Sequence, residues 1–204
     1  MKMAEIKKPN LKVASFTLRG TAPYVGNKFS AEAREMMRAK QAAGSQAKKG
    51  QKREPKDFAK CAREATHFLP DGSCGIPATS FRQALVSACR LVGFKMTLAK
   101  LGLFVEADGY DMDDASPLVR FTKGEPQHFE AATRNDTGVA DIRARPLWAP
   151  GWEAVVRIRF DADLFSESDV RNLMERVGVQ VGIGAGRPDS KESCGQGWGT
   201  FEIV

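Results

Sequence analysis

The sequence predicts an α+β fold in which an antiparallel sheet carries two helices. Three observations support this prediction: an alternating segment near the start of the chain, two segments with the 3.6-residue periodicity of amphipathic helices, and short apolar segments between and after them. The chain has 204 residues, of which 42% are hydrophobic. This is enough for one core, so we expect a single domain over residues 1–204.

The first predicted strand runs from Leu11 to Arg19, where apolar and polar side chains alternate in part. The turn-forming sequence Thr21-Ala22-Pro23-Tyr24 ends it. Residues from about 28 to 64 then form a basic insertion. Within it, Ala31 to Ala43 has a helical composition, and residues 42–52 are typical of a mobile loop.

A short strand at His67-Phe68-Leu69 and a tight turn at Asp71-Gly72 precede the first predicted helix. Ser80 and Gln83 have the spacing of a capping box, which predicts that the helix starts at Ser80. Its buried face carries Phe81, Ala84, Leu85, Ala88, Cys89 and Val92, and Gly93 suits its end.

Two further strands are predicted at Leu101 to Ala107 and at Leu118 to Thr122, separated by an acidic run from Asp108 to Asp114. This run lacks the glycine at position six and the glutamate at position twelve of an EF-hand loop. We therefore expect a solvated turn there, and not a calcium site. Residues 123–139 are polar and are expected to be irregular.

Ile142 to Trp148 and Trp152 to Asp161 predict a hairpin around Pro150-Gly151. Ser166, with Asp169 at the third helical position, then caps the second predicted helix. Its buried face carries Val170, Leu173, Met174 and Val177, with Gly178 at its C-terminal turn and a last strand at Thr200 to Val204. The resulting order of elements is that of a ferredoxin-like domain, the plan shared by RNA-recognition modules.

The net charge of +6 is concentrated in one segment. Eleven Lys and Arg and five Asp and Glu lie between Lys28 and Glu64, whereas the rest of the chain carries twenty of each sign. A localised basic excess is typical of an arm that binds a polyanion. The candidate phosphate contacts in this arm are Lys28, Lys48, Lys49, Lys52 and Arg53. The alternative is a solvated tether that contacts nothing.

A glycine-rich tail occupies residues 182–199 and contains six glycines. Arg187, Lys191 and Trp198 are interleaved with them, a combination that suits a negatively charged polymer of bases. No helix or acidic partner follows, as a dinucleotide fingerprint requires, and Lys191 follows Ser190 instead of preceding Ser or Thr as in a P-loop. The alternative is a flexible surface hairpin with no ligand.

Four scattered cysteines without a C-x-x-C pair predict reduced thiols, with no zinc site or disulfide framework. No apolar run approaches the length of a membrane span, and the first residues contain no hydrophobic signal region. These features predict a cytoplasmic protein with no cofactor, no bound metal and no membrane partner.

Ile76-Pro77-Ala78-Thr79-Ser80-Phe81-Arg82-Gln83-Ala84-Leu85 resembles the Ile-Pro-Gly-Ser-Ser-Leu-Lys-Gly-Ala-Leu signature that opens the first helix in the RAMP superfamily. These are RNA-binding proteins associated with CRISPR antiviral defence. The tail resembles their C-terminal glycine-rich loop, and the branch that looks most similar is the CRISPR backbone subunit (Cas-seven-like), which lines up along guide RNA. Compact phage-encoded proteins look similar too. Ala78 and Gln83 replace the two glycines of the signature, and Val86 stands where an arginine often follows.

The resemblance implies that two regions contact the nucleic-acid backbone. One is the helix start, with Ser80 and Arg82. The other is the tail, with Gly184, Gly186, Arg187, Gly197 and Gly199. It also implies assembly side by side along the strand as a homo-oligomer, with other CRISPR subunits as further partners.

Catalysis and binding make different demands on the sequence. RNA cleavage by acid–base chemistry would use His67 or His128, and neither has an evident partner in the sequence. Binding uses the basic arm, the alternating Arg143 and Arg145, and the candidate stacking platforms Tyr24, Trp148, Trp152 and Trp198, for which core packing is the alternative.

We therefore expect a non-catalytic protein that binds single-stranded RNA or DNA. The alternatives are a histidine-dependent endoribonuclease and a phage protein that mimics or inhibits a CRISPR backbone.

Overall fold

The computed structural model describes residues 7–29, 35–36, 38–39, 57–134, 140–190 and 194–204. The elements, in chain order, are β1 Leu11–Gly20, β2 Tyr24–Val25, α2 Phe58–Glu64, β3 Gly75–Pro77, α3 Ala78–Leu91, α4 Met96–Gly102, β4 Leu103–Glu106, β5 Gly109–Tyr110, β6 Pro117–Lys123, β7 Gln127–Arg134, β8 Ala140–Trp148, β9 Glu153–Asp161, α5 Glu167–Arg176, the π-helical turn η1 Val177–Val181, and β10 Phe201–Ile203. The fold is therefore a mixture of helices and antiparallel sheets, as expected. No helix among the described residues is both long and apolar enough to cross a membrane.

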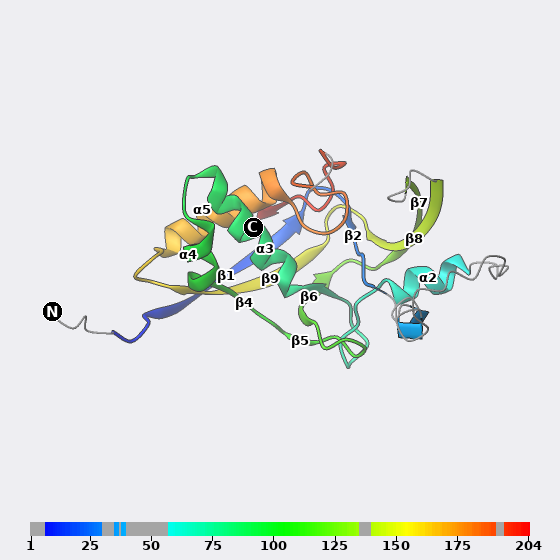
Figure 1. The fold of residues 1–204 in the computed structure, drawn as a ribbon, viewed down its shortest axis with the longest axis horizontal. Helices are drawn as coiled ribbons and strands as arrows, with labels where there is room; N and C mark the ends of the chain where they lie inside the picture. Colours follow the sequence, from blue (N-terminus) through cyan, green and yellow to red (C-terminus); the bar gives the residue numbers. More distant parts are fainter. Residues whose placement is uncertain (1–6, 30–34, 37, 40–56, 135–139, 191–193) are drawn as a thin grey trace.

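The main sheet has the strand order β10-β1-β9-β6-β3, with β4 paired to β9 and β5 paired to β6. Its central pair is antiparallel and runs from Leu11 opposite Asp161 to Arg19 opposite Glu153. Helices α3, α4 and α5 lie together on one side of this sheet (Figure 1). A second sheet has the order β2-β8-β7, and its β7–β8 hairpin extends away from α3, α4 and α5, beside α2 (Figure 1).

Alternation along the central strands builds the core. In β1 the buried side chains are Ala14, Phe16 and Leu18, and they lie opposite buried residues of β9. From the helices, Phe81 and Leu85 of α3 and Val170, Leu173 and Met174 of α5 belong to the same buried cluster. Because each large side chain of this kind gains about 1.5–3 kcal/mol on burial, this layer of contacts fixes the helices against the sheet.

The two predicted helices form, but one begins earlier than expected. Helix α5 has the predicted capping box, in which Ser166 Oγ accepts from the Asp169 amide and the Asp169 side chain accepts from the Ser166 amide. Helix α3 begins at Ala78 with Pro77 as its N-cap, and no side chain caps it. The predicted capping box at Ser80 and Gln83 is therefore wrong: Ser80 already lies inside the first turn.

The predicted hairpin around Pro150-Gly151 is also wrong, although both of its strands exist. Strand β8 pairs with β2 and β7, whereas β9 pairs with β1, β4 and β6, so the chain passes from one sheet to the other between them. Trp148 and Trp152 flank this crossing and are both buried, which anchors it in the core.

Residues 123–139 were expected to be irregular, but Gln127–Arg134 form β7. This strand lacks a regular apolar alternation and is held by its pairing with β8, from Gln127 opposite Leu147 to Arg134 opposite Ala140. The short helices α2 and α4 were also not predicted, and most of the expected helix at Ala31 to Ala43 lies outside the described residues.

Candidate nucleic-acid interface

A cavity of about 400 Å³ lies between α3 and the glycine-rich tail. One wall is a face of α3 with Pro77, Ser80, Gln83, Ala84 and Ser87, the other is the tail with Ile183, Gly184, Ala185, Arg187 and Asp189, and Tyr24, Asn27, His67 and Val181 complete the lining. We call this cavity the tail groove. It brings together Ser80, Gly184 and Arg187, which the sequence placed in two separate candidate regions. A larger cavity of about 640 Å³ near the end of α3 and α5 contains none of the predicted site residues.

The tail is packed against the protein. Its six glycines all have positive φ angles, between 65° and 75°. The Gly199 amide donates to Pro23 O at 2.7 Å, and the Ala185 amide donates to Val25 O at 3.0 Å. These bonds join the tail to β2 and to the residue before it. The interpretation as a flexible surface hairpin is therefore wrong for the described part of the tail.

The glycines serve this internal packing. A Cβ on Gly184 would lie 2.7 Å from Tyr24 Cε2 and 2.8 Å from Val25 O, and one on Gly186 would lie 2.6 Å from Trp198 Cε3. Gly199 likewise leaves no room for a Cβ beside the Ile183 carbonyl. We expected these backbones to approach a nucleic acid closely, but what they approach is the protein's own chain. Gly197 differs, because nothing lies within 4 Å of its Cβ position.

Positive charge lies beside the groove at two places. Arg187 lines it and donates from Nη1 to Gly184 O at 3.2 Å, so the guanidinium is held beside the cavity. The start of α3, a helix of 14 residues, reaches the groove at Pro77 and Ser80 with no side-chain cap. Its first amides carry the partial positive charge that attracts anions to helix N-termini.

Asp189 fastens the tail to α3 from the other side. Its carboxylate accepts a short hydrogen bond from Ser87 Oγ and a bond of 3.0 Å from Arg90 Nη2. The bond from Ser87, aided by Arg90 and opposed by burial, lowers the pKa of this carboxyl. Asp189 is therefore an anion at neutral pH, and it offsets part of the positive charge of Arg187.

A second cluster lies on the β7–β8 hairpin, and we call it the hairpin face. Trp198 of the tail is half-buried and packs edge-to-face on Phe129, with ring centres 5.5 Å apart. Phe129 lies opposite Arg145 in the β7–β8 register, and Arg143 follows two residues from Arg145 on the same face, as predicted. Burial and the nearby charge of Arg143 lower the pKa of Arg145. No pattern in the sequence indicated Phe129, because its strand was not predicted.

Other predicted platforms and contacts are internal. Tyr24, Trp148 and Trp152 are buried, with exposures of 1–2%, so the core interpretation is right and the stacking interpretation is wrong for these three. Phe121 stacks on Trp148 at 4.4 Å. Burial raises the pKa of the Tyr24 hydroxyl.

Arg82 lies away from the tail groove. Its Nε donates to Leu103 O at 3.0 Å and its Nη2 to Lys100 O at 2.6 Å, at the C-terminal end of α4. Its guanidinium also lies over the Phe104 ring, 4.8 Å from the ring centre. Because residues two apart point to nearly opposite sides of a helix, Ser80 and Arg82 could not share the same groove. Arg82 closes a helix end, so the structure does not bring it together with Ser80 at the tail groove.

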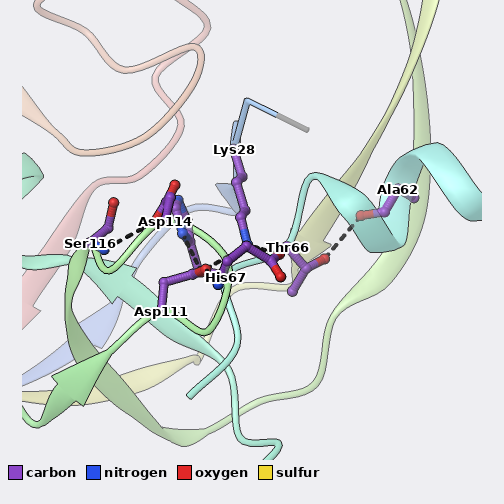
Figure 2. A network of polar contacts seen from close by, with 8 residues as sticks. Lys28, Ala62, Thr66, His67, Asp111, Asp114 and Ser116 are labelled. Carbon is purple, nitrogen blue, oxygen red and sulfur yellow. Dashed lines mark hydrogen bonds and ion pairs between the residues drawn. The ribbon is translucent and has the colours of Figure 1, made fainter. Parts of the chain in front are cut away.

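Lys28 is buried in a network of charges (Figure 2). Its Nζ lies 2.7 Å from Asp111 Oδ1 and 2.6 Å from Asp113 Oδ2, with the Lys28 side chain only 1% exposed. Burial acts to lower the pKa of Lys28, but the bonds to Asp111 and Asp113 outweigh it and raise the pKa. Lys28 is therefore a structural cation, and its expected role as a phosphate contact is wrong.

His67 completes this network. Its Nδ1 lies 2.8 Å from Asp111 Oδ2, and the Asp113 amide donates to Asp111 Oδ1 at 2.8 Å. Burial alone would raise the pKa of Asp111, but the bonds from Lys28, the Asp113 amide and His67 lower it to about 2. The expected solvated turn is therefore wrong at Asp111, whose side chain is fully buried.

His67, Asp111 and Asp114 have ligand-type atoms within 4.8 Å of one another, a spacing that a metal ion could use. Both Asp111 oxygens are already engaged by Lys28 and His67, and Asp114 Oδ1 accepts from the Ser116 amide at 2.9 Å. The ammonium of Lys28 thus supplies the positive charge that the carboxylates need.

The remaining predicted nucleic-acid contacts lie outside the described residues; these are Lys48, Lys49, Lys52, Arg53 and Lys191.

No protein family model matches the chain, and no curated protein matches it. Among solved structures, the fold is similar to that of a chain in a cryo-EM structure of the Type III-B Cmr-beta complex bound to cognate target RNA. The TM-score is 0.51 and the sequence identity is 10%, with 96% of this chain and 59% of that chain covered. This chain therefore spans less than two thirds of the Cmr chain, and the likeness is one of fold.

Gly184→Val should destabilise the protein by about 3 kcal/mol or more, because the side chain meets Tyr24 and Val25 and φ is positive. Gly197→Val is the matched control, since Gly197 has a similar φ of 74° but open space around it. Its cost should be about 1–2 kcal/mol from the backbone alone. Urea unfolding of both variants measures the difference, and equal losses would show that the tail is not packed as described.

The buried carboxylate of Asp111 should make the protein sensitive to acid. Its folded pKa of about 2 lies below the ordinary value of 3.8, so its charged form stabilises the fold by about 2 kcal/mol above pH ~4. This stabilisation is lost as the pH falls toward about 2.

Asp111→Asn should lower stability at neutral pH, because Lys28 loses a partner, and should make the acid dependence shallower. Urea unfolding over a series of pH values tests this, with the surface variant Asp163→Asn as control. An unchanged acid profile in Asp111→Asn would contradict the described network.

Proposed function

We propose that this protein binds single-stranded nucleic acid through the tail groove and the hairpin face, without cleaving it. The observation that carries the proposal is the convergence of Ser80, the uncapped start of α3 and Arg187 at one groove. The hairpin face adds Trp198, Phe129 and Arg145, which combine aromatic rings with cations. Phosphates attract the cations, and bases stack on the rings without regard to sequence.

The fold likeness supports RNA as the ligand, since the Cmr-beta structure is of a complex bound to target RNA. We further assign the main sheet to the ferredoxin-like plan, because β10, β1, β9 and β4 follow one another across it and α3 and α5 lie on one side of it. On this proposal the chain is a RAMP-type subunit that assembles along the strand with copies of itself or with other CRISPR subunits. A phage protein that mimics such a subunit would use the same surface.

The basic arm contributes the sequence-independent part of binding. We keep as proposed phosphate contacts, because of their charge, Lys48, Lys49, Lys52 and Arg53 of the arm and Lys191 of the tail. We leave Lys28 and Arg82 out of the proposed contacts, because Lys28 is buried between two carboxylates and Arg82 bonds to the end of α4.

A second candidate function is cleavage of RNA by His67. The observation that favours it is the bond between His67 Nδ1 and buried Asp111, which resembles the way an aspartate orients a catalytic histidine. His67 also lines the tail groove, although its side chain is only 10% exposed. We place binding first, because Asp111 is shared with Lys28 and the pair is accounted for by the internal network.

Arg187→Ala and Arg145→Ala should each weaken binding to a single-stranded oligonucleotide by about tenfold at moderate salt. The slope of log affinity against log salt should become shallower by about one for each phosphate contact removed. Fluorescence anisotropy over a salt series measures both quantities. Arg171→Ala, an exposed arginine on α5, is the matched control, and melting temperatures verify folding. Undiminished affinity in folded Arg187→Ala and Arg145→Ala would reject this surface as the binding site.

Labelled RNA incubated with the protein in the absence of metal should remain intact. His67→Ala tests the second candidate, with His128→Ala as control, since His128 is exposed on β7 and pairs with Glu130. Cleavage at defined positions that disappears in His67→Ala and persists in His128→Ala would replace the binding proposal by the nuclease.

A further inference from the structure

The lining of the tail groove includes more kinds of side chain than the binding of a phosphate requires. Besides Arg187 and the start of α3, two side-chain amides line it, those of Asn27 and Gln83. The lining also includes the apolar Tyr24, Ala84 and Ile183. A phosphate is satisfied by cations and amide N–H groups, and it gains nothing from apolar walls. Apolar walls with a few fixed polar groups are typical of a site for a ring-shaped ligand, and the volume of about 400 Å³ is sufficient for one.

Both amides are available to a ligand. Asn27 and Gln83 are exposed, and neither side chain has a hydrogen-bond partner among the described residues. The side chains around them are engaged: Ser87 donates to Asp189, Arg187 donates to Gly184 O, and His67 contacts Asp111. With Ser80, whose hydroxyl also makes no hydrogen bond among the described residues, Asn27 and Gln83 offer the donors and acceptors of the groove that a ligand can use.

The backbone at both residues is held in place. Gln83 lies in the second turn of α3. Asn27 lies between two residues with fixed amides, since Gly26 N donates to Pro146 O at 3.0 Å and Lys28 N donates to Ala65 O at 3.2 Å. The buried Lys28 side chain fixes the chain further at this point. A fixed backbone limits the positions that the two carboxamides can take, which helps a site to discriminate between ligands.

A carboxamide presents a donor and an acceptor side by side. Adenine presents the complementary pair on two edges, its amino donor beside N1 and beside N7, whereas cytosine presents it on one edge. Two carboxamides can therefore both bind adenine, and Asn and Gln are the residues that recognise it in this bidentate way. Proteins that read single strands turn a base out of the stack and bind its edge. The guanidinium of Arg187 beside the same groove would then hold the neighbouring phosphate.

We propose that the tail groove takes one unstacked base of the bound strand, adenine, and reads its hydrogen-bonding edge through Asn27 and Gln83. This inference rests on the proposed function and adds to it a preference at one position of the strand. The rest of the interface, made of cations and stacking rings, reads no sequence.

The test compares a uridine oligonucleotide with three others that carry a single adenosine, cytidine or guanosine at the centre. The wild-type protein should bind the adenosine strand about tenfold more tightly than the others, within the range for one bidentate contact. In the double variant Asn27→Ala/Gln83→Ala, affinity for the adenosine strand should fall to the level of the uridine strand. Asn172→Ala, an exposed amide on α5 outside the groove, should keep the preference. Melting temperatures establish that the variants fold.

The outcomes separate the two levels of the proposal. If the wild-type protein binds none of the four strands, the proposed function fails and this inference fails with it. If it binds all four equally, or prefers cytidine, guanosine or uridine, the adenine site is overturned while strand binding stands. If adenosine is preferred and the preference survives in the folded double variant, Asn27 and Gln83 do not read the base.

Discussion

The candidate site depends on one constraint, the close contact between the glycine-rich tail and the start of β2. The bonds from Gly199 N to Pro23 O and from Ala185 N to Val25 O hold the tail there, and the positive φ angles of its glycines make that path possible. With the tail fixed on β2 and tied to α3 through Asp189, a groove is left between helix and tail. The same path places Trp198 on Phe129, so the groove and the hairpin face are parts of one arrangement.

Two buried groups join the second sheet and the acidic loop to this arrangement. Tyr24 contacts Trp148, Trp152 and Phe121 in a cluster of rings whose members come from both sheets. Lys28 lies four residues further along and binds the carboxylates of the acidic loop. Between them lies Asn27, so a short stretch of chain contributes a core residue, a groove residue and a buried ion pair. Substitutions at Tyr24 or Lys28 would therefore alter the shape of the groove, although both residues are buried.

Periodicity and capping predicted the parts of the fold that are stabilised locally. Strand β1 and helix α5 have the expected bounds to within a residue or two, because alternation and the Ser166–Asp169 capping box report short-range structure. The pairing of β8 was wrong, because a Pro-Gly turn shows that the chain bends and does not show which strands pair afterwards. Strand β7 was missed because its partner, and not its own apolar pattern, stabilises it.

The sequence identified part of the site and misassigned the rest for similar reasons. Ser80 and Arg187 were chosen in two separate regions, and the structure brings them to one cavity. Arg82 was assigned from the family resemblance, but its position on the helix turns it to α4. The charge of Lys28 is cancelled by residues more than eighty positions away, which composition cannot reveal. The contact between Phe129 and Trp198 could not be predicted, because strand β7 was not predicted.

The anchoring of Lys28 also decides how the basic segment can act. Lys28 N donates to Ala65 O at 3.2 Å, so the segment between these residues leaves and re-enters the fold at the same place. That place adjoins Asn27, at the edge of the groove. Ten of the chain's Lys and Arg residues lie between Lys28 and Ala65, and two of them, Lys60 and Arg63, belong to α2. On the proposed function, a segment whose two ends are anchored at the edge of the groove would keep its cations at a high effective concentration around a bound strand, and it would add avidity without a shaped site of its own.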